Sequence, residues 1–410
     1  MRVSTNMIYD RGVATIQRQT ADLLKTQQQV SSGRRILTPA DDPIGAARAL
    51  EITQSKAINN QFVTNQGYAE DNLKLLENRL TGVGEVLQYV RGRTIQAGNA
   101  ALSQTELNFI AIDLRAQYDA MVGLANSQDA NNEFLFAGYK SQTRPFQGGF
   151  GAVNYAGDEG ARTIQVSGSR FMPVSFPGSD VFSRTRPLGD DLVVAEASSA
   201  NTGGATVSGG LAAGFATTPG AEQYLGRRLE IVFNGTDFDV TEYLPGIAAP
   251  NFVGTVASLA QLADPADPAY RGVDVQLNPA AAVAAGDRFE VFVGSTDMFA
   301  NLAVFVDALE RPGPSGMAGG AVGFALQTLD AGLDNVLRVR AQIGSQLVEV
   351  DNLRNVGEDL DIQYATTLSR LQDVDFAEAI SRLTRQQTFL EAAQASFVRV
   401  TGLSLFNFIN

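Results

Sequence analysis

Apolar residues recur at helical spacing near the beginning of the chain. Within residues 5–32, which contain no proline, large apolar residues return every seven or eight positions: Ile8, Ile16, Leu23 and Val30. That spacing places them on one stripe of an α-helix. Gly33 stands where a C-terminal helix cap is expected. Asp42 followed by Pro43 has the pattern of an N-cap with proline at the first helical position. The pattern therefore predicts one helix ending near Gly33 and another beginning near Pro43.

The second predicted helix runs from Ile44 to about Gly98 and carries a sustained heptad seam. Its apolar positions alternate spacings of three and four residues: Leu73, Leu76, Leu80, Val83, Leu87 and Val90. A helix of this size would be roughly 80 Å long. The run Ser103–Glu106 has the spacing of a capping box and predicts the start of a third helix.

The other end of the chain mirrors this pattern. Residues 298–310 predict a short apolar helix, and a heptad resumes between Leu326 and Val350 after a glycine-rich segment. A final helix is expected from about Asp375. Its apolar stripe consists of Phe376, Ile380, Leu383, Leu390, Phe397 and Val400.

The middle of the chain, residues 147–296, has the composition of strands and turns. Residues 153–155 and 163–166 predict one hairpin. Residues 229–233 and 237–240 predict a second one, with Asn-Gly at 234–235 in a type I′ turn. Residues 273–277 and 288–293 alternate apolar and polar side chains as further strands. Residues 188–222 are low in charge and are not assigned to any element. We therefore expect a mainly α fold with an inserted β-rich domain.

These patterns divide the chain into four predicted regions, in which both chain ends build a discontinuous rod of long coiled-coil helices. The regions are residues 1–40 with 371–410 (terminal coiled coil, for assembly), 41–146 with 297–370 (long-helix rod), 147–186 (β-hairpin region packed on the rod) and 187–296 (outer β-rich domain).

The terminal helices carry too few large apolar residues to be stable alone, because ordering a long helix costs conformational entropy at every residue. Residues 400–410 contain no charge, and an exposed apolar tail of this kind marks a binding surface. We expect both ends to be disordered in the monomer and to order on assembly. The candidate assembly interface is Ile8, Ile16, Leu23, Val30, Phe376, Ile380, Leu383, Leu390, Phe397, Val400, Leu403, Leu405, Phe406 and Phe408. On these residues alone, docking of each terminal helix on its own domain explains the pattern equally well.

Composition argues against several classes of function. The chain of 410 residues has no cysteine and no histidine, so it lacks a thiolate nucleophile and the commonest general base and metal ligand. An enzyme could still use paired carboxylates, lysine or tyrosine, but we expect no enzyme and no cofactor. The net charge of -13 argues against binding to nucleic acid. No apolar run is long enough to span a membrane, and residues 1–10 lack the pattern of a signal peptide. We therefore expect no membrane insertion and no cleavable signal.

Two acidic clusters have an alternative reading as chemical sites. Asp41 and Asp42 could bind a metal or act as an acid–base pair, but a carboxylate just before Pro43 fits a helix cap better. The group Asn234, Asp237, Asp239 and Glu242 resembles a calcium loop superficially. It lacks the spacing of an EF-hand, so a solvated hairpin edge is favoured.

Several longer runs resemble one protein family. The segments 27–36, 39–43 and 46–49 (QQQVSSGRRI, PADDP and AARA) are similar to the N-terminal signature of the flagellin superfamily. Residues 132–141 (NEFLFAGYKS), followed by Pro145-Phe146, resemble its hook–filament junction branch. Residues 373–379 and 402–409 are similar to that branch too. The resemblance covers roughly residues 1–186 and 287–410.

The resemblance implies a structural role in the bacterial flagellum. Members of the family assemble through paired terminal helices, with long helices around them and a β-rich domain projecting outward. The implied partners are copies of the chain itself, another hook-associated protein, flagellin and a flagellar export chaperone. The implied location is the extracellular flagellum, reached through the flagellar type III export channel. Two alternatives stay open, namely flagellin itself and an adhesin-like β module that binds a surface from a helical stalk.

Overall fold

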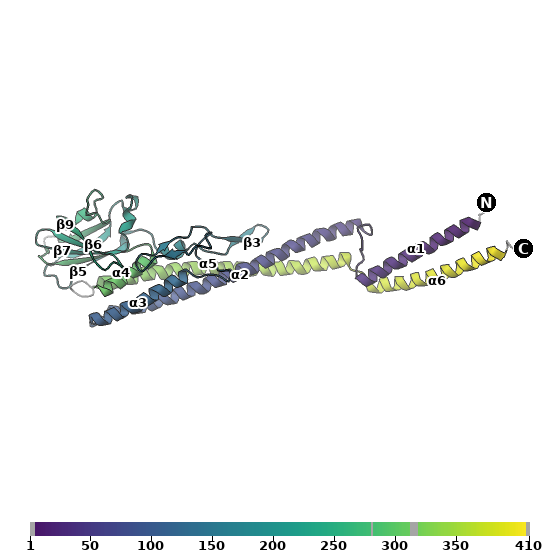
Figure 1. Cartoon of the computed structure of the whole chain (residues 1–410), viewed down its shortest axis with the longest axis horizontal. Helices are drawn as coiled ribbons and strands as arrows, with labels where there is room; N and C mark the ends of the chain where they lie inside the picture. Colours follow the sequence, from purple (N-terminus) through teal and green to yellow (C-terminus); the bar gives the residue numbers. More distant parts are fainter. Residues whose placement is uncertain (1–4, 280–281, 312–318, 407–410) are drawn as a thin grey trace. The chain divides into compact units, whose positions relative to one another are not determined.

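The computed structural model describes residues 5–279, 282–311 and 319–406. These residues belong to two compact units. The terminal unit consists of residues 1–64 with 352–410, and the central unit consists of residues 65–351. Both ends of the chain are helical and the middle contains antiparallel sheets, which confirms the predicted fold class (Figure 1).

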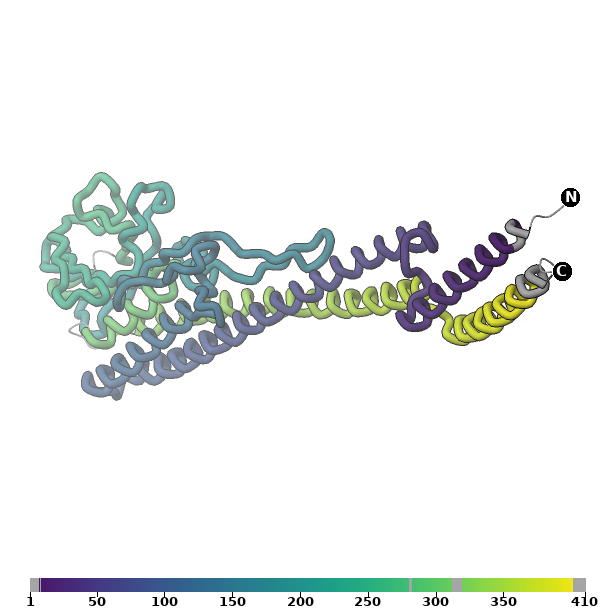
Figure 2. Tube along the Cα trace, turned by 45° about the vertical axis from the view of Figure 1, so that its right-hand side comes forward, coloured from purple at the N-terminus to yellow at the C-terminus, as the bar shows by residue number. Residues whose placement is uncertain are grey.

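In the terminal unit, helices α1 (Thr5–Ser32) and α6 (Phe376–Phe406) lie side by side and run antiparallel (Figure 2). The same unit contains the first part of α2 (Pro43–Ala97) and the last part of α5 (Gly319–Gln372). The Nδ2 atom of Asn59 donates to the carbonyl of Gly357 at 2.7 Å, which ties these two parts together.

The helices of the central unit form around the predicted heptad seam. The seam residues of α2 between Leu73 and Val90 are at most 1% exposed. Helix α3 (Gln104–Ala125) begins at the predicted capping box, in which Ser103 and Glu106 exchange hydrogen bonds. Helix α4 (Met298–Glu310) packs against α3, and its first turn is capped by the carboxylate of Asp297. The seam of these helices is therefore core within one chain.

The β part of the central unit is antiparallel throughout. Its main sheet has the order β5-β11-β7-β8-β9, and three two-stranded sheets pair β10 with β6, β1 with β2, and β3 with β4. One face of the main sheet forms the core of this region, with Leu229, Val240 and Val291 fully buried. The strands are β1 (Phe146–Gln147), β2 (Asn154–Tyr155), β3 (Thr163–Ser167), β4 (Arg170–Pro173), β5 (Val193–Ala197), β6 (Thr206–Leu211), β7 (Arg227–Phe233), β8 (Phe238–Tyr243), β9 (Asn251–Val256), β10 (Val273–Asn278) and β11 (Arg288–Val293).

Short helical turns connect these strands. They are a π-helical turn at Ser179–Ser183 and 3₁₀ turns at Asp190–Leu192, Phe215–Thr217, Ala221–Tyr224 and Leu259–Leu262.

The structure corrects two predictions for the middle of the chain and shows two strands where none was predicted. The hairpin between residues 153–155 and 163–166 is wrong, since β2 pairs back to β1 and β3 pairs forward to β4. Residues 188–222, left unassigned, contain β5 and β6. The hairpin of β7 and β8 is confirmed, but its turn is not type I′, because Gly235 has a φ of 107° and Asn234 has no positive φ.

The physical reason for the first error is a side-chain contact that the spacing does not reveal. Asn126, just after α3, exchanges two hydrogen bonds with the backbone of Phe146, at 3.0 and 2.9 Å. This contact holds β1 beside the helix end, where it is available to pair with β2. The acidic turn at residues 157–160 is instead organised by Asp158, whose carboxylate accepts from the backbone of Tyr139 and Gly160.

Candidate assembly interface

The paired terminal helices meet along a heptad seam. The less exposed positions of both helices recur at intervals of three and four residues. They include Ile16, Gln19, Leu23, Thr26 and Val30 in α1, and Ala379, Leu383, Gln386, Leu390, Ala393 and Phe397 in α6. The rings of Tyr9 and Phe397 lie 5.2 Å apart between centroids. Six of the predicted interface residues therefore lie along the α1–α6 contact of one chain.

This seam is thin and partly polar. Its large apolar side chains are only partly buried, whereas Leu76 in the central unit is 0% exposed. Gln19 and Gln386 each have a buried Oε1 atom that accepts no hydrogen bond from any described residue. A buried acceptor without a partner weakens the packing around it. The two helices therefore do not form a closed core by themselves.

Apolar side chains also lie on the outer faces of both helices. Among the predicted residues, Phe376, Ile380 and Val400 are about half exposed. The prediction missed other exposed apolar residues of the pair: Met7, Tyr9, Leu24, Phe389 and Val398. The signal for several of them was a second apolar residue directly beside a seam position, as in Leu23-Leu24, Phe389-Leu390 and Phe397-Val398.

Some predicted interface residues lie outside what the structure describes. Helix α6 extends to Phe406, but the side chains of Leu403, Leu405 and Phe406 are not described, and neither is that of Ile8 in α1. Phe408 lies beyond the described residues. The assembly role of all these positions stays a prediction.

The segments that enter and leave this helix pair are bonded to each other. Gly33 has a φ of 69°, and its carbonyl accepts a hydrogen bond from the backbone of Val374 at 2.9 Å. The backbone N–H of Arg35 donates to Gln372 at 2.6 Å, and its guanidinium donates to the carbonyl of Leu371 at 2.9 Å. The ends of α1 and α5 and the start of α6 are therefore fixed relative to one another within the terminal unit.

Asp41 and Asp42 both take part in this connection. The Nζ atom of Lys25 lies 2.6 Å from Asp41, whose carboxylate also accepts from the backbone of Leu37 and Thr38. The hydrogen bond from Lys25, followed by that from Thr38, lowers the pKa of Asp41 to about 2. Asp42 accepts from the backbone of Gly45 at 2.9 Å, and this bond holds its pKa below the usual value.

These contacts describe a capped helix start rather than a chemical site. Helix α2 begins at Pro43, directly after Asp42. Within the described residues, no group of three or more acidic, histidine or cysteine side chains is arranged to hold a metal ion.

The acidic group in the outer strands does not converge on a point either. The buried carboxylate of Glu242 forms ion pairs with Arg227 and Arg271. Asp239 accepts from the hydroxyl of Thr255 at 2.6 Å. Asn234 accepts from the backbone of the hairpin turn. Asn234 also donates to Asp239 at 3.3 Å, whereas Glu242 is paired with arginines, so the arrangement is that of a hairpin and not of a calcium loop.

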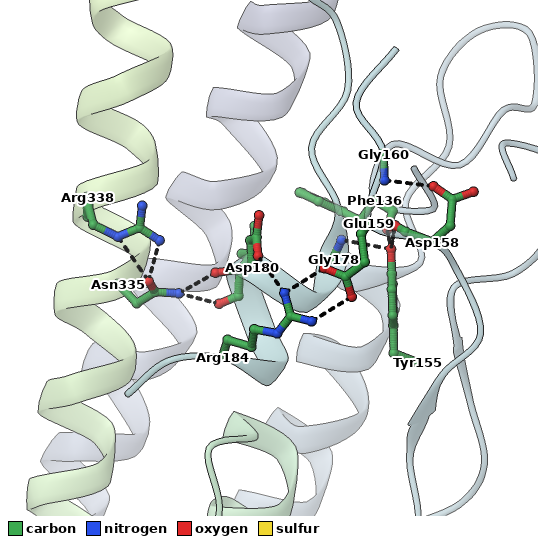
Figure 3. Close-up of polar contacts among 11 residues, drawn as sticks. Phe136, Tyr155, Asp158, Glu159, Gly160, Gly178, Asp180, Arg184, Asn335 and Arg338 are labelled. Carbon is green, nitrogen blue, oxygen red and sulfur yellow. Dashed lines mark hydrogen bonds and ion pairs between the residues drawn. The ribbon is translucent and has the colours of Figure 1, made fainter. Parts of the chain in front are cut away.

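The run at residues 132–141 has a structural role in the central unit (Figure 3). The hydroxyl of Tyr155 lies 2.8 Å from the carbonyl of Asp158 and 3.1 Å from that of Phe136, and it accepts from the N–H of Gly178. Burial raises the pKa of Tyr155 to about 12, so it stays a protonated donor. This tyrosine therefore joins three loop segments at one point.

A second set of contacts ties the same loops to α5 (Figure 3). The Nδ2 atom of Asn335 donates to the carbonyls of Asp180 and Val181 at 2.9 and 2.8 Å, and Arg338 donates to Asn335. Arg184 makes two hydrogen bonds to Glu159 at the surface. Asn335 therefore ties the segment around Asp180 to α5, and the ion pair of Arg184 with Glu159 links two loops at the surface.

None of the helices in the described ranges is both long and apolar enough to cross a membrane.

Comparison with known proteins identifies the family. The bacterial flagellin N-terminal helical region matches residues 3–141, and the bacterial flagellin C-terminal helical region matches residues 326–409. Together they cover more than half of the chain.

Full-length relatives agree with this match. Flagellar hook-associated protein 3 of Salmonella typhimurium is 27% identical over 411 residues, with 99% of both chains covered. Its counterpart in Escherichia coli gives the same identity and coverage. The crystal structure of FlgL from Xanthomonas campestris is 27% identical and superposes with a TM-score of 0.52, covering 78% of this chain and 99% of that one. Hook-associated protein 3 from Legionella pneumophila, at 22% identity, 78% and 98% coverage and a TM-score of 0.51, shares the fold. The chain therefore belongs to the flagellin family and is homologous to flagellar hook-associated protein 3.

Proposed function

We propose that this chain is a structural subunit at the junction between the flagellar hook and filament, and that it assembles through α1 and α6. The observation that carries the proposal is the incomplete burial of the α1–α6 pair. Its seam leaves the large apolar side chains partly exposed, and further apolar residues lie on its outer faces. Apolar surface of this extent favours association, because neighbouring subunits can remove it from water.

In this proposal, residues 1–40 with 371–410 form the assembly domain. Residues 41–146 with 297–370 form the rod that supports it, residues 147–186 pack on the rod, and residues 187–296 form the outer domain. The assembly domain contacts copies of the same chain, another hook-associated protein and flagellin. The names of the relatives, which are flagellar hook-associated proteins, support this choice of partners.

We also propose that the chain works without catalysis, outside the cell, after export in an unfolded state with an export chaperone. The absence of cysteine supports passage through a narrow channel, since no disulfide can form before export. The thin seam of the α1–α6 pair supports terminal helices that order on assembly.

Deletion of the gene in its own bacterium tests the proposed function. Electron microscopy should show hooks without filaments, with flagellin released into the medium. The full-length chain should restore filaments, whereas a chain lacking residues 400–410 should not. Attached filaments in the deletion strain would overturn the proposal. Quantification of the chain in isolated flagella provides a separate check, because an amount comparable with that of the filament subunit would favour flagellin instead.

A point variant isolates the role of the outer faces. Phe389 is 60% exposed in α6, and its neighbour Gln387 is also exposed. Phe389→Asp should prevent filament attachment by placing a charge where a neighbour is expected to pack. Gln387→Asp adds the same charge nearby and should preserve attachment. Attached filaments in Phe389→Asp, as in Gln387→Asp, would mean that this face is not an assembly surface.

A further inference from the structure

The turn between β7 and β8 contains an asparagine followed by a glycine. Asn234 and Gly235 connect the two strands, and both residues are exposed. Asn234 is the only asparagine in the sequence that precedes a glycine. Glycine has no Cβ, so the backbone nitrogen that follows Asn234 is not shielded by a side chain. This pair of residues therefore places a weak nucleophile beside a side-chain amide at the surface of the outer β region.

The side-chain carbonyl of Asn234 is polarised by the turn. Its Oδ1 atom accepts hydrogen bonds from the backbone N–H groups of Thr236 at 3.1 Å and Asp237 at 2.9 Å. Two donors aimed at a carbonyl oxygen stabilise the negative charge that the oxygen gains when a nucleophile adds to its carbon. The turn therefore makes the Cγ atom of Asn234 more open to attack.

The backbone nitrogen of Gly235 is the nucleophile closest in the chain to this carbon. No described residue accepts a hydrogen bond from its N–H group. A Cβ added at Gly235 would meet only the Cβ of Ala285, at 3.5 Å, so few atoms surround this part of the backbone. Rotation about the Cα–C and Cα–Cβ bonds of Asn234 brings the nitrogen to Cγ and closes a five-membered ring. The surroundings therefore leave this rotation possible in the folded chain.

A carboxylate lies beside the nitrogen that would leave. The Nδ2 atom of Asn234 donates to Asp239 at 3.3 Å, and Asp239 also accepts from the hydroxyl of Thr255 at 2.6 Å. A carboxylate at this place can pass on the proton that the departing nitrogen needs. The nucleophile, the activated carbon and the proton relay are therefore brought together by one hairpin.

We propose that Asn234 is a site of spontaneous deamidation through a succinimide. The Gly235 nitrogen forms a bond to Cγ of Asn234, the bond from Cγ to Nδ2 breaks, and ammonia leaves with the proton that the Gly235 nitrogen loses. Water then opens the ring and returns a proton to that nitrogen. Addition of water at Cγ gives aspartate, and addition at the backbone carbonyl carbon gives isoaspartate. Water is the only co-reactant, and nothing is oxidised or reduced.

The product changes the turn but leaves the sheet in place. Either product adds one negative charge to the net charge of -13 and sets it beside Asp239, where the amide donated before. Isoaspartate also lengthens the main chain by one carbon, in a turn closed by the 3.0 Å bond from the N–H of Asn234 to the carbonyl of Asp237. The flanking core residues Ile231 and Val240 are fully buried and hold the strands. The surface of the outer β region therefore gains charge as the protein ages.

Mass spectrometry of the purified full-length chain tests the proposal with an internal control. Trypsin should release residues 229–271 as one peptide, whose two asparagines are Asn234 and Asn251. Asn251 is also exposed, and its amide also donates to a carboxylate, that of Glu242 at 3.1 Å, but Phe252 follows it. After incubation at neutral and mildly alkaline pH, we expect conversion at Asn234 to be at least about tenfold faster than at Asn251. A sample digested without incubation gives the background.

The form of the product and two comparisons decide the outcome. Isoaspartate at position 234 would support the succinimide, because direct hydrolysis of the amide gives aspartate alone. The variant Asn234→Gln should stop the modification, since its longer side chain does not form the five-membered ring. Equal rates at Asn234 and Asn251 would overturn the proposal, and so would conversion that occurs only after the chain is unfolded in urea. The purified chain suffices for this test, so its result is independent of the role at the junction.

Discussion

The polar residue Gln386 in the middle of the α1–α6 seam gives a prediction about how weakly the terminal helices are held in the free monomer. Its side chain is partly buried, and its buried Oε1 atom accepts no hydrogen bond from any described residue. We expect Gln386→Leu to stabilise the helix pair, since leucine suits a seam position and removes the unpaired acceptor.

The expected gain is the sum of two contributions. Full burial of a leucine side chain contributes about 1.5–3 kcal/mol, so a half-buried position should provide about 1 kcal/mol. Removal of a buried, unpaired acceptor adds about 1 kcal/mol, at the low end of its usual cost. The total of about 2 kcal/mol corresponds to about a 30-fold change in the equilibrium between the open and closed pair.

Amide hydrogen exchange on the dilute monomer measures this equilibrium. Protection in α1 and α6 should rise about 30-fold in Gln386→Leu, and filament assembly should be tested alongside it. The neighbouring exposed residue supplies the matched control, because Gln387→Leu adds the same side chain outside the seam. An equal rise in both variants would refute the argument, and so would wild-type helices that already exchange only by global unfolding.

Three further predictions concern other parts of the chain. Arg228 is 2% exposed and pairs with Glu290, so Arg228→Ala should lower the free energy of unfolding by about 3–5 kcal/mol in urea denaturation. The exposed pair of Arg91 and Asp330 makes Arg91→Ala a control with a loss of about 1 kcal/mol or less. The ion pair of Asp41 with Lys25 should stabilise the connection between α1 and α2 fully above pH 3.8, the ordinary pKa of this carboxyl group, and the stabilisation should be lost as the pH falls through about 2. An NMR titration should show the pKa of Asp41 rising toward 3.8 in Lys25→Ala. An unchanged pKa would exclude Lys25 as the cause of the shift. Gly33→Ala should lower the free energy of unfolding by about 1–2 kcal/mol, because the backbone φ at this position is 69°. Gly67→Ala within α2 should stabilise the chain, because an added Cβ meets no atom within 4 Å there. Thermal unfolding measures both effects.

The positions of the helices could be predicted from the sequence alone. Their heptads, the capping box at Ser103 and the proline at 43 are local signals, and the observed bounds of α2 and α4 match the predicted ones. The strands at 273–278 and 288–293 were also visible, because alternation depends only on which face is buried. The flagellin resemblance came from short runs of residues, and it was confirmed by relatives that span the full chain.

Only the tertiary structure decided which strands pair and which apolar residues remain exposed. The pairing of β1 with β2 depends on the side chain of Asn126, and β5 pairs with β11, which lies far away in the sequence. A heptad shows that a helix has an apolar stripe, but it does not show whether one partner helix covers that stripe completely. In α1 and α6 the partner comes from the opposite end of the chain and covers it only in part, because polar side chains interrupt the seam.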